Sequence, residues 1–201
     1  QDALFWIAWD GVKLGQHQTP PFAQALWDVL ESTKDLRDTL VYEVSEILEV
    51  LAPTEPMRVA ALVLTYLKYD WGWRNDQHLQ PVLARCLEAS PGDVWELIGD
   101  ALLSPDAFAL TLSLRRTPLV LKASLEVLLD WAGRHKPEGP RVLGERAKPS
   151  SVPMEELPRQ LLIRFGDDKH VCSALFAAFE TEDWWGPAVD HVDRKLAIVK
   201  E

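Results

Sequence analysis

Apolar residues recur at helical spacing along most of the chain, and no stretch alternates convincingly between apolar and polar residues as a half-buried strand does. Between Phe22 and Leu30 the apolar positions fall at i, i+3, i+4, i+7 and i+8, directly after two prolines that suit the first turn of a helix. A second stripe runs from Leu36 to Leu51 and has glutamates on its opposite face. The pattern predicts an all-α protein.

Turn and cap signals divide the rest of the chain into further helices. Prolines at 53 and 56 end the second stripe, and the prolines that follow Ser104 and Thr117 mark helix starts. Residues 90–93 are expected to form a turn before a helix that begins at Val94. The predicted helices cover 55–69, 76–89, 94–103, a segment starting at 105, 119–131, 154–165, 168–181 and 187 to the end.

The segment 134–153 differs from its surroundings because prolines and glycines interrupt it repeatedly. We expect a flexible loop, and a loop of this length inside a compact domain is usually functional or disordered. It is also basic within an acidic chain, which leaves two interpretations open: a solvated insertion, or a docking segment for an acidic partner. Its cations are Arg134, Lys136, Arg141, Arg146 and Lys148.

The most specific signal is an internal similarity at an offset of 113 residues, between segments that begin at Ala61 and Ala174. Both read A-L-x3-[YF]-x3-D-W-x6-H-[LV]-x3-L, and a weaker third echo lies at 125–131. The pattern predicts two helical hairpins whose Asp-Trp corners, at Trp71 and Trp184, join antiparallel helices. Because one hairpin cannot bury its own apolar face, the hairpins are expected to stack.

Residues 183–187 read Asp-Trp-Trp-Gly-Pro and are followed by His191, Lys195 and Leu196. This corner resembles those in HEAT-like helical segments of large bacterial multidomain proteins. The resemblance implies antiparallel hairpins stacked as a right-handed α-solenoid or an irregular helical bundle, and a scaffold or recognition surface within a larger machine. We expect a single helical-repeat domain over 1–201 that is a fragment of a longer chain.

The charge balance narrows the class of partner. A formal net charge of −10 and a pI near 5.0 disfavour broad binding to nucleic acid or anionic membranes, whose phosphates would be repelled. Cys86 and Cys172 have no disulfide or metal-site spacing, which is typical of reduced thiols in the cytoplasm. No apolar run reaches the roughly 18 residues that a membrane span needs. We therefore expect a cytoplasmic protein.

The sequence contains no recognisable catalytic motif. It has neither a G-x-S-x-G elbow nor a phosphate-binding glycine loop. Asp167 and His170 have the i, i+3 spacing of a helical metal site, but a carboxylate-bundle centre needs a second such pair, and the sequence offers none. His78 and His191 occupy equivalent repeat positions, which indicates a structural role. We predict no catalytic residue, no cofactor and no metal.

Nine tryptophans are available for packing or recognition. Those in apolar helical stripes are predicted to be core: Trp6, Trp27, Trp95 and Trp131. The loop pairs are Trp71 with Trp73, and Trp184 with Trp185. Either these pairs anchor a partner, since Trp is enriched among interface hot spots, or they pack between repeats.

Together these features predict a non-catalytic helical scaffold that binds another protein or a neighbouring domain of the same chain. The candidate partner-binding residues are Trp71, Trp73, Trp184, Trp185, Arg134, Lys136, Arg141, Arg146 and Lys148. The alternative is a regulatory or nucleic-acid-contacting domain of a larger enzyme, in which the basic 134–148 segment touches phosphates. A freestanding all-α enzyme with an unrecognised site is a third hypothesis.

Overall fold

The computed structural model describes residues 2–33, 40–69, 76–104, 114, 122–146 and 156–180. Within these residues it contains ten α-helices, one short 3-10 helix and no strand, so the predicted all-α class is confirmed. The chain divides into two compact units, residues 1–124 and 125–201. We describe each unit by itself, and the single domain expected over 1–201 stays a prediction.

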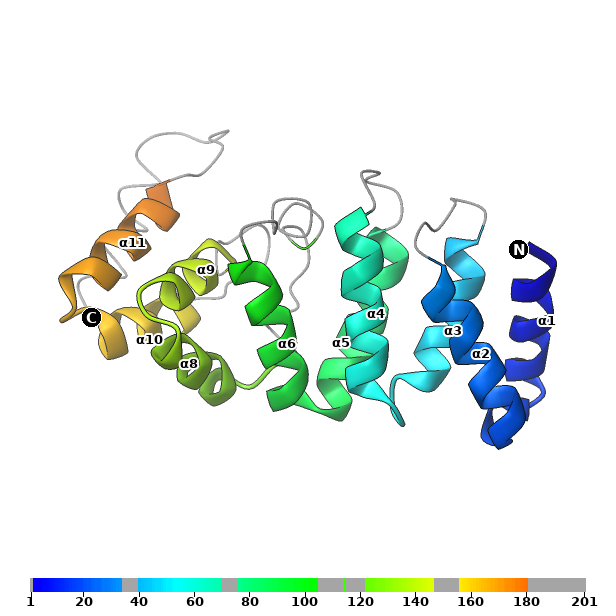
Figure 1. Ribbon diagram of the computed structural model, residues 1–201. Coiled ribbons are helices and arrows are strands. Elements are labelled where there is room, and N and C mark those ends of the chain that lie inside the picture. The colour runs from blue at the N-terminus through cyan, green and yellow to red at the C-terminus, as the bar shows by residue number, and fades with distance from the viewer. Residues whose placement is uncertain are drawn as a thin grey trace. The chain divides into compact units, whose positions relative to one another are not determined.

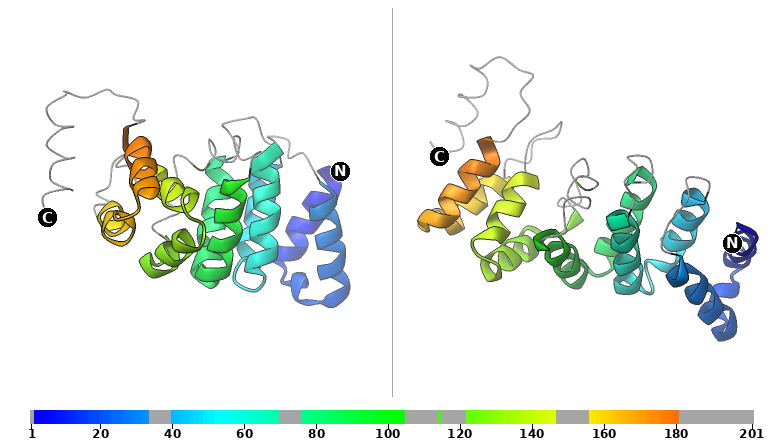
Figure 2. Two further views of the ribbon diagram at one scale, coloured as in Figure 1. Left: turned by 60° about the vertical axis from the view of Figure 1, so that its left-hand side comes forward. Right: turned by 45° about the horizontal axis from the view of Figure 1, so that its top comes forward.

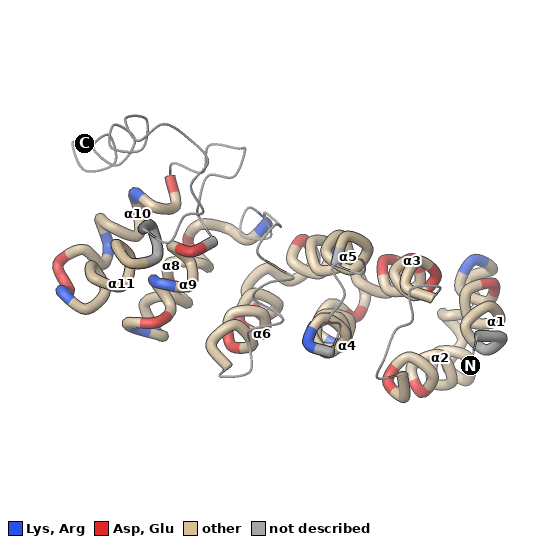
Figure 3. The backbone as a smooth tube through the Cα atoms, turned by 90° about the horizontal axis from the view of Figure 1, so that it is seen from above, with Lys and Arg blue, Asp and Glu red and all other residues tan. Residues whose placement is uncertain are grey.

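The first unit is a double layer of helices. In Figure 3, which views the helices end-on, α1, α3 and α5 lie in one row and α2, α4 and α6 in another. Within a layer α3 packs between α1 and α5, and α4 packs against α6; α4 also packs against α5 of the other layer. The elements are α1 (Asp2–Lys13), a 3-10 turn (Gln16–Gln18), α2 (Pro20–Ser32), α3 (Val41–Leu51), α4 (Pro56–Tyr69), α5 (Asp76–Ala89) and α6 (Pro91–Leu103) (Figure 1).

The apolar stripes of these helices fill the space between the layers. In α3, residues 44, 47, 48 and 51 are all buried, which is the i, i+3, i+4, i+7 set of one helical face. Gly15 ends α1 in the left-handed conformation, at a φ of 74°, and its N–H bonds the carbonyl oxygen of Val12 at 2.9 Å. The turn predicted at 90–93 is wrong, because Pro91 is the first residue of α6.

The hairpin expected for the first repeat copy is present as α4 and α5, which lie side by side in both views of Figure 2. Its corner, with Trp71 and Trp73, falls at 70–75, outside the described residues. Most of the second copy, with Trp184 and Trp185, falls at 181–201 and also lies outside them. The 113-residue repeat therefore stays a prediction.

The second unit contains α8 (Leu125–Arg134), α9 (Glu138–Arg146), α10 (Glu156–Phe165) and α11 (Lys169–Glu180). Helix α9 packs against α11 and α8, and α10 contacts all three. The Asp168 carboxylate accepts backbone N–H bonds from His170 and Val171, and these bonds lower its pKa. Asp168 therefore caps α11, as its position at a predicted helix start suggested.

The flexible loop predicted at 134–153 is wrong where the structure describes it. Arg134 ends α8, and residues 138–146 form α9. Pro140 lies in the first turn of α9, where a helix tolerates proline. Gly139 is buried so close to α8 that a Cβ would come within 3.0 Å of the Ala132 Cα. Glycine therefore permits close helix packing here, and composition alone could not show this.

Among the described residues, no helix combines the length and the apolar character that crossing a membrane requires.

Candidate functional site

A pocket of about 380 Å³ lies on the α1, α3 and α5 layer of the first unit. Helix α3 lies between the other two, so it forms the centre of the site. The lining residues are Trp9, Val12 and Lys13 of α1, Glu46, Glu49 and Val50 of α3, and Arg85 of α5. Polar, charged and apolar groups from three helices thus meet at one place.

Helical spacing brings these side chains to the pocket. On α1, Phe5, Ala8 and Val12 are buried, and the face one residue further along carries Trp6, Trp9 and Lys13. On α3, Tyr42, Glu46 and Glu49 follow at i, i+4 and i+7, beside the buried stripe. Each helix therefore buries one face and presents the adjoining face at the pocket.

Glu46 joins α1 to α3 through what we call the Trp9 cluster, formed by Trp9, Lys13, Tyr42 and Glu46. Trp9 donates its indole N–H to one carboxylate oxygen at 2.6 Å, and Tyr42 donates its hydroxyl to the other at 2.5 Å. The Lys13 ammonium lies 3.3 Å from the Trp9 ring centroid and 3.9 Å from Glu46 Oε2. Both carboxylate oxygens of Glu46 are thus engaged within the protein.

These contacts shift the pKa values of both partners. The hydrogen bond from Tyr42, then that from Trp9 and the charge of Lys13, hold the pKa of Glu46 below its ordinary value. The same bond to Glu46 raises the pKa of the Tyr42 phenol. The ionised carboxylate is therefore the form that links the two helices.

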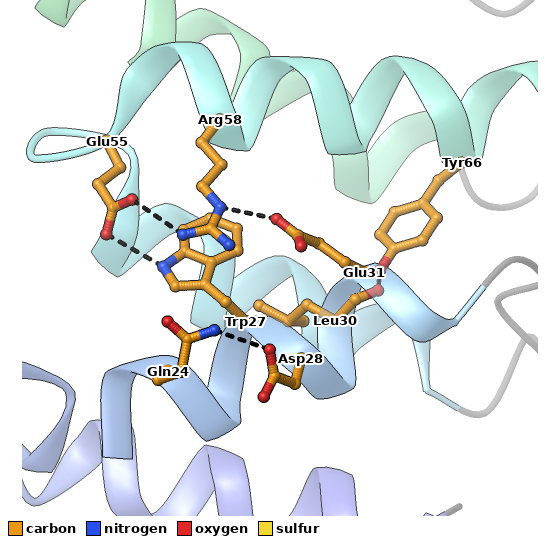
Figure 4. Close-up of polar contacts among 8 residues, drawn as sticks. All are labelled: Gln24, Trp27, Asp28, Leu30, Glu31, Glu55, Arg58 and Tyr66. Atoms are coloured by element: carbon orange, nitrogen blue, oxygen red, sulfur yellow. Dashed lines mark hydrogen bonds and ion pairs between the residues drawn. The ribbon is translucent and has the colours of Figure 1, made fainter. Parts of the chain in front are cut away.

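A related group, the Trp27 cluster of Trp27, Glu31, Glu55 and Arg58, joins α2 to α4 in the other layer (Figure 4). Trp27 donates its indole N–H to Glu55 at 3.0 Å, and the Arg58 guanidinium stacks 4.1 Å from the ring centroid. Arg58 also donates to Glu31 at 2.7 Å. Because Trp27 is only 2% exposed, this cluster serves packing and offers no aromatic surface to a partner.

Three large side chains on α1 and α3 are exposed at or beside the pocket: Val50 lines it, Trp6 contacts Trp9, and Tyr42 bonds Glu46. Trp6 is 47% exposed, Tyr42 52% and Val50 44%. The Trp6 ring stands edge-on to Trp9, with 5.4 Å between centroids and 84° between planes. We call Trp6, Trp9, Tyr42 and Val50 the aromatic patch; it adjoins charged groups of the pocket.

The prediction of four core tryptophans is wrong for Trp6 and confirmed for Trp27, Trp95 and Trp131, all of which are buried. Trp6 directly follows the buried Phe5, so the turn of the helix points it away from the core. The apolar character of α1 as a whole concealed this difference between its faces.

The predicted partner-binding residues lie elsewhere or outside the described chain. Trp71, Trp73, Trp184, Trp185 and Lys148 fall outside the described residues, and their role stays a prediction. In the second unit the predicted cations are spread over α8, the following turn and α9. Lys136 lies 5.0 Å from the Phe165 ring centroid, Arg141 forms an ion pair with Glu145, and Arg146 ends α9.

Sequence reasoning missed the residues of the pocket. The glutamates of α3 are expected opposite its apolar stripe, whereas both carboxylate oxygens of Glu46 accept hydrogen bonds and Glu43 is only 9% exposed. The i, i+4 spacing of Tyr42 and Glu46 was a usable local signal. The bond from Trp9 spans 37 residues and leaves no local trace.

No family model, curated protein or solved structure matches this chain. The described helices define the class of the protein, which is all-helical with its helices packed in pairs.

Proposed function

We propose that the chain is a non-catalytic helical scaffold whose α1, α3 and α5 layer binds another protein or a neighbouring domain. The observation that carries the proposal is the aromatic patch beside the pocket, with Trp6, Tyr42 and Val50 each about half exposed. Exposed Trp and Tyr side chains on a rigid surface supply large contact area at small entropic cost.

The engagement of the pocket's polar groups supports a binding role. Trp9 and Tyr42 both bond Glu46, and Lys13 covers the Trp9 ring, so these groups fix the surface before a partner arrives. Such preorganisation lowers the cost of association. The buried thiol Cys86 has a pKa raised to about 12 by desolvation, which suits packing and not nucleophilic attack.

A HEAT-like stack remains our proposal for the architecture. The two layers of the first unit and the packed α4–α5 hairpin are what stacked antiparallel hairpins would produce. A cytoplasmic location is also part of the proposal, since Cys86 and Cys172 are both free.

The alternative role, contact with nucleic acid through 134–148, receives less support. Two of the cations on which it depends have contacts within the second unit: Arg141 pairs with Glu145, and Lys136 lies over Phe165. Cations already paired in this way have less to gain from a phosphate.

Photo-crosslinking tests the proposal in the native cells. Benzoylphenylalanine placed at position 6 or 50 should form adducts with one protein partner or neighbouring domain, because both positions lie on the proposed surface. Position 14 is the matched control: Leu14 is 75% exposed, belongs to the same unit and is not among the pocket residues. Equal adducts from position 14, or none from positions 6 and 50, would contradict the proposal.

A further inference from the structure

The charged side chains that line the pocket differ in whether they already have a partner within the protein. Glu46 accepts two hydrogen bonds, and Lys13 lies between its carboxylate and the Trp9 ring. These two opposite charges compensate each other. Glu49 and Arg85 remain as the charged groups of the lining that a partner could engage.

Of these two residues, Glu49 is better placed to bind a charged group of a partner. It lies one turn beyond Glu46 on α3, is partly exposed, and within the described residues forms no hydrogen bond or ion pair. Arg85 also forms no hydrogen bond or ion pair within the described residues, but its side chain is more exposed than that of Glu49, so solvent screens its charge more strongly. The carboxylate therefore gains more from a new partner than the guanidinium does.

The surroundings favour a cation. Helix α3 carries Glu43, Glu46 and Glu49 but no lysine or arginine, and the whole chain has a net charge of −10. The two cations of the lining, Lys13 and Arg85, lie on the flanking helices α1 and α5, so a basic side chain is attracted to the carboxylates of α3 at the centre of the site. The ring of Trp6 and the phenol of Tyr42 stand nearby, and aromatic groups also favour cations.

From these observations we propose that the pocket receives an arginine or lysine side chain from a basic segment of the partner protein. Glu49 pairs with the cation, and apolar residues on either side of it rest on Trp6 and Val50. The pocket volume of about 380 Å³ is near the lower end of the roughly 300–1,000 Å³ typical of ligand sites, which suits one long side chain. This inference rests on the proposed scaffold function.

Peptide selection on the whole chain tests the inference. A random 12-residue library displayed on phage should yield peptides with an arginine or lysine flanked by apolar residues. For a selected arginine peptide, replacement of arginine by citrulline, which keeps the shape and loses the charge, should weaken binding about tenfold in calorimetry. Glu49→Gln should cause the same loss, and the two changes together should cost no more than either alone.

The control is Glu88→Gln. Glu88 lies on α5, is paired with Lys122 and is outside the pocket lining. Binding should be unchanged in this variant. Selection of acidic peptides that depend on Arg85, or of apolar peptides that depend on Trp6 but not on Glu49, would overturn the inference and leave the scaffold proposal standing. Failure to select any peptide sensitive to Trp6→Ser or Glu49→Gln would count against both.

Discussion

The indole nitrogen of Trp9 lies 2.6 Å from a carboxylate oxygen of Glu46, and this hydrogen bond joins α1 to α3 across 37 residues of sequence. Trp27 and Glu55 make the corresponding bond in the other layer, at 3.0 Å. In each case a cation lies over the tryptophan ring, Lys13 in the first and Arg58 in the second. Each layer thus contains a tryptophan that donates its indole N–H to a carboxylate on a neighbouring segment and has a cation over its ring.

Replacing Glu46 by Gln should lower the free energy of unfolding by about 1 kcal/mol at pH 7, since a partly exposed charged hydrogen bond is lost. The folded-state pKa of Glu46 lies below its ordinary 4.5, so its contribution is complete above that pH and is lost as the pH falls below it. Urea unfolding at a series of pH values should show the difference between the two proteins shrinking below pH 4.5. A difference independent of pH would contradict this account.

The two tryptophans at positions 27 and 6 should differ sharply in their effect on stability. Trp27→Ala empties a buried site and should cost about 3–5 kcal/mol. Trp6→Ala, on the exposed patch of the same unit, should lower the free energy of unfolding by about 1 kcal/mol, mainly through loss of the edge contact with Trp9. Denaturant midpoints measure both. Equal losses would show that Trp6 is part of the core.

Tyr66→Phe should destabilise the protein by about 1 kcal/mol, because the buried phenol donates a 2.6 Å hydrogen bond to the Leu30 carbonyl. Burial raises the pKa of Tyr66 well above its ordinary 10.0. Ionisation is therefore easier in the unfolded chain, and stability should fall as the pH rises past 10. Unfolding curves at pH 8 and above should show that the phenylalanine variant loses less stability on this alkaline side. A parallel loss in both proteins would refute the assignment.

Gly139→Ala should destabilise the second unit by about 1–3 kcal/mol, since its Cβ would crowd the backbone of Ala132 at 3.0–3.1 Å. Gly92→Ala is the matched control, because nothing lies within 4 Å of the added Cβ in the first turn of α6. The control should be neutral or slightly stabilising in thermal unfolding. A harmless Gly139→Ala would mean that α8 and α9 do not approach each other as described.

Local sequence signals predicted the helices well where prolines and apolar stripes agree. The expected helix at 76–89 is α5 without change, and that at 55–69 differs from α4 by one residue. Composition misled at 134–146, the part of the predicted loop that the structure describes, because the packing of Gly139 against Ala132 outweighs the low helix propensity of glycine. Contact between α8 and α9, which a single sequence does not display, determines the helical structure there.

The candidate site was largely beyond prediction for the same reason. Tyr42 and Glu46 share one helix, so their bond follows from spacing. The pocket, however, depends on α1, α3 and α5 standing in one layer, and residues 9, 46 and 85 meet only there. The exposure of Trp6 could have been predicted from the phase of the α1 stripe, set by Phe5, Ala8 and Val12.

The most direct measurement is the affinity of the crosslinked partner, once purified, for the wild-type chain and for Trp6→Ser and Leu14→Ser variants. If the α1, α3 and α5 layer is the binding surface, calorimetry should show the dissociation constant rising at least about 30-fold for Trp6→Ser, as expected for a hot spot, and unchanged for Leu14→Ser. Equal affinities for the wild type and Trp6→Ser, with both variants folded, would contradict the account.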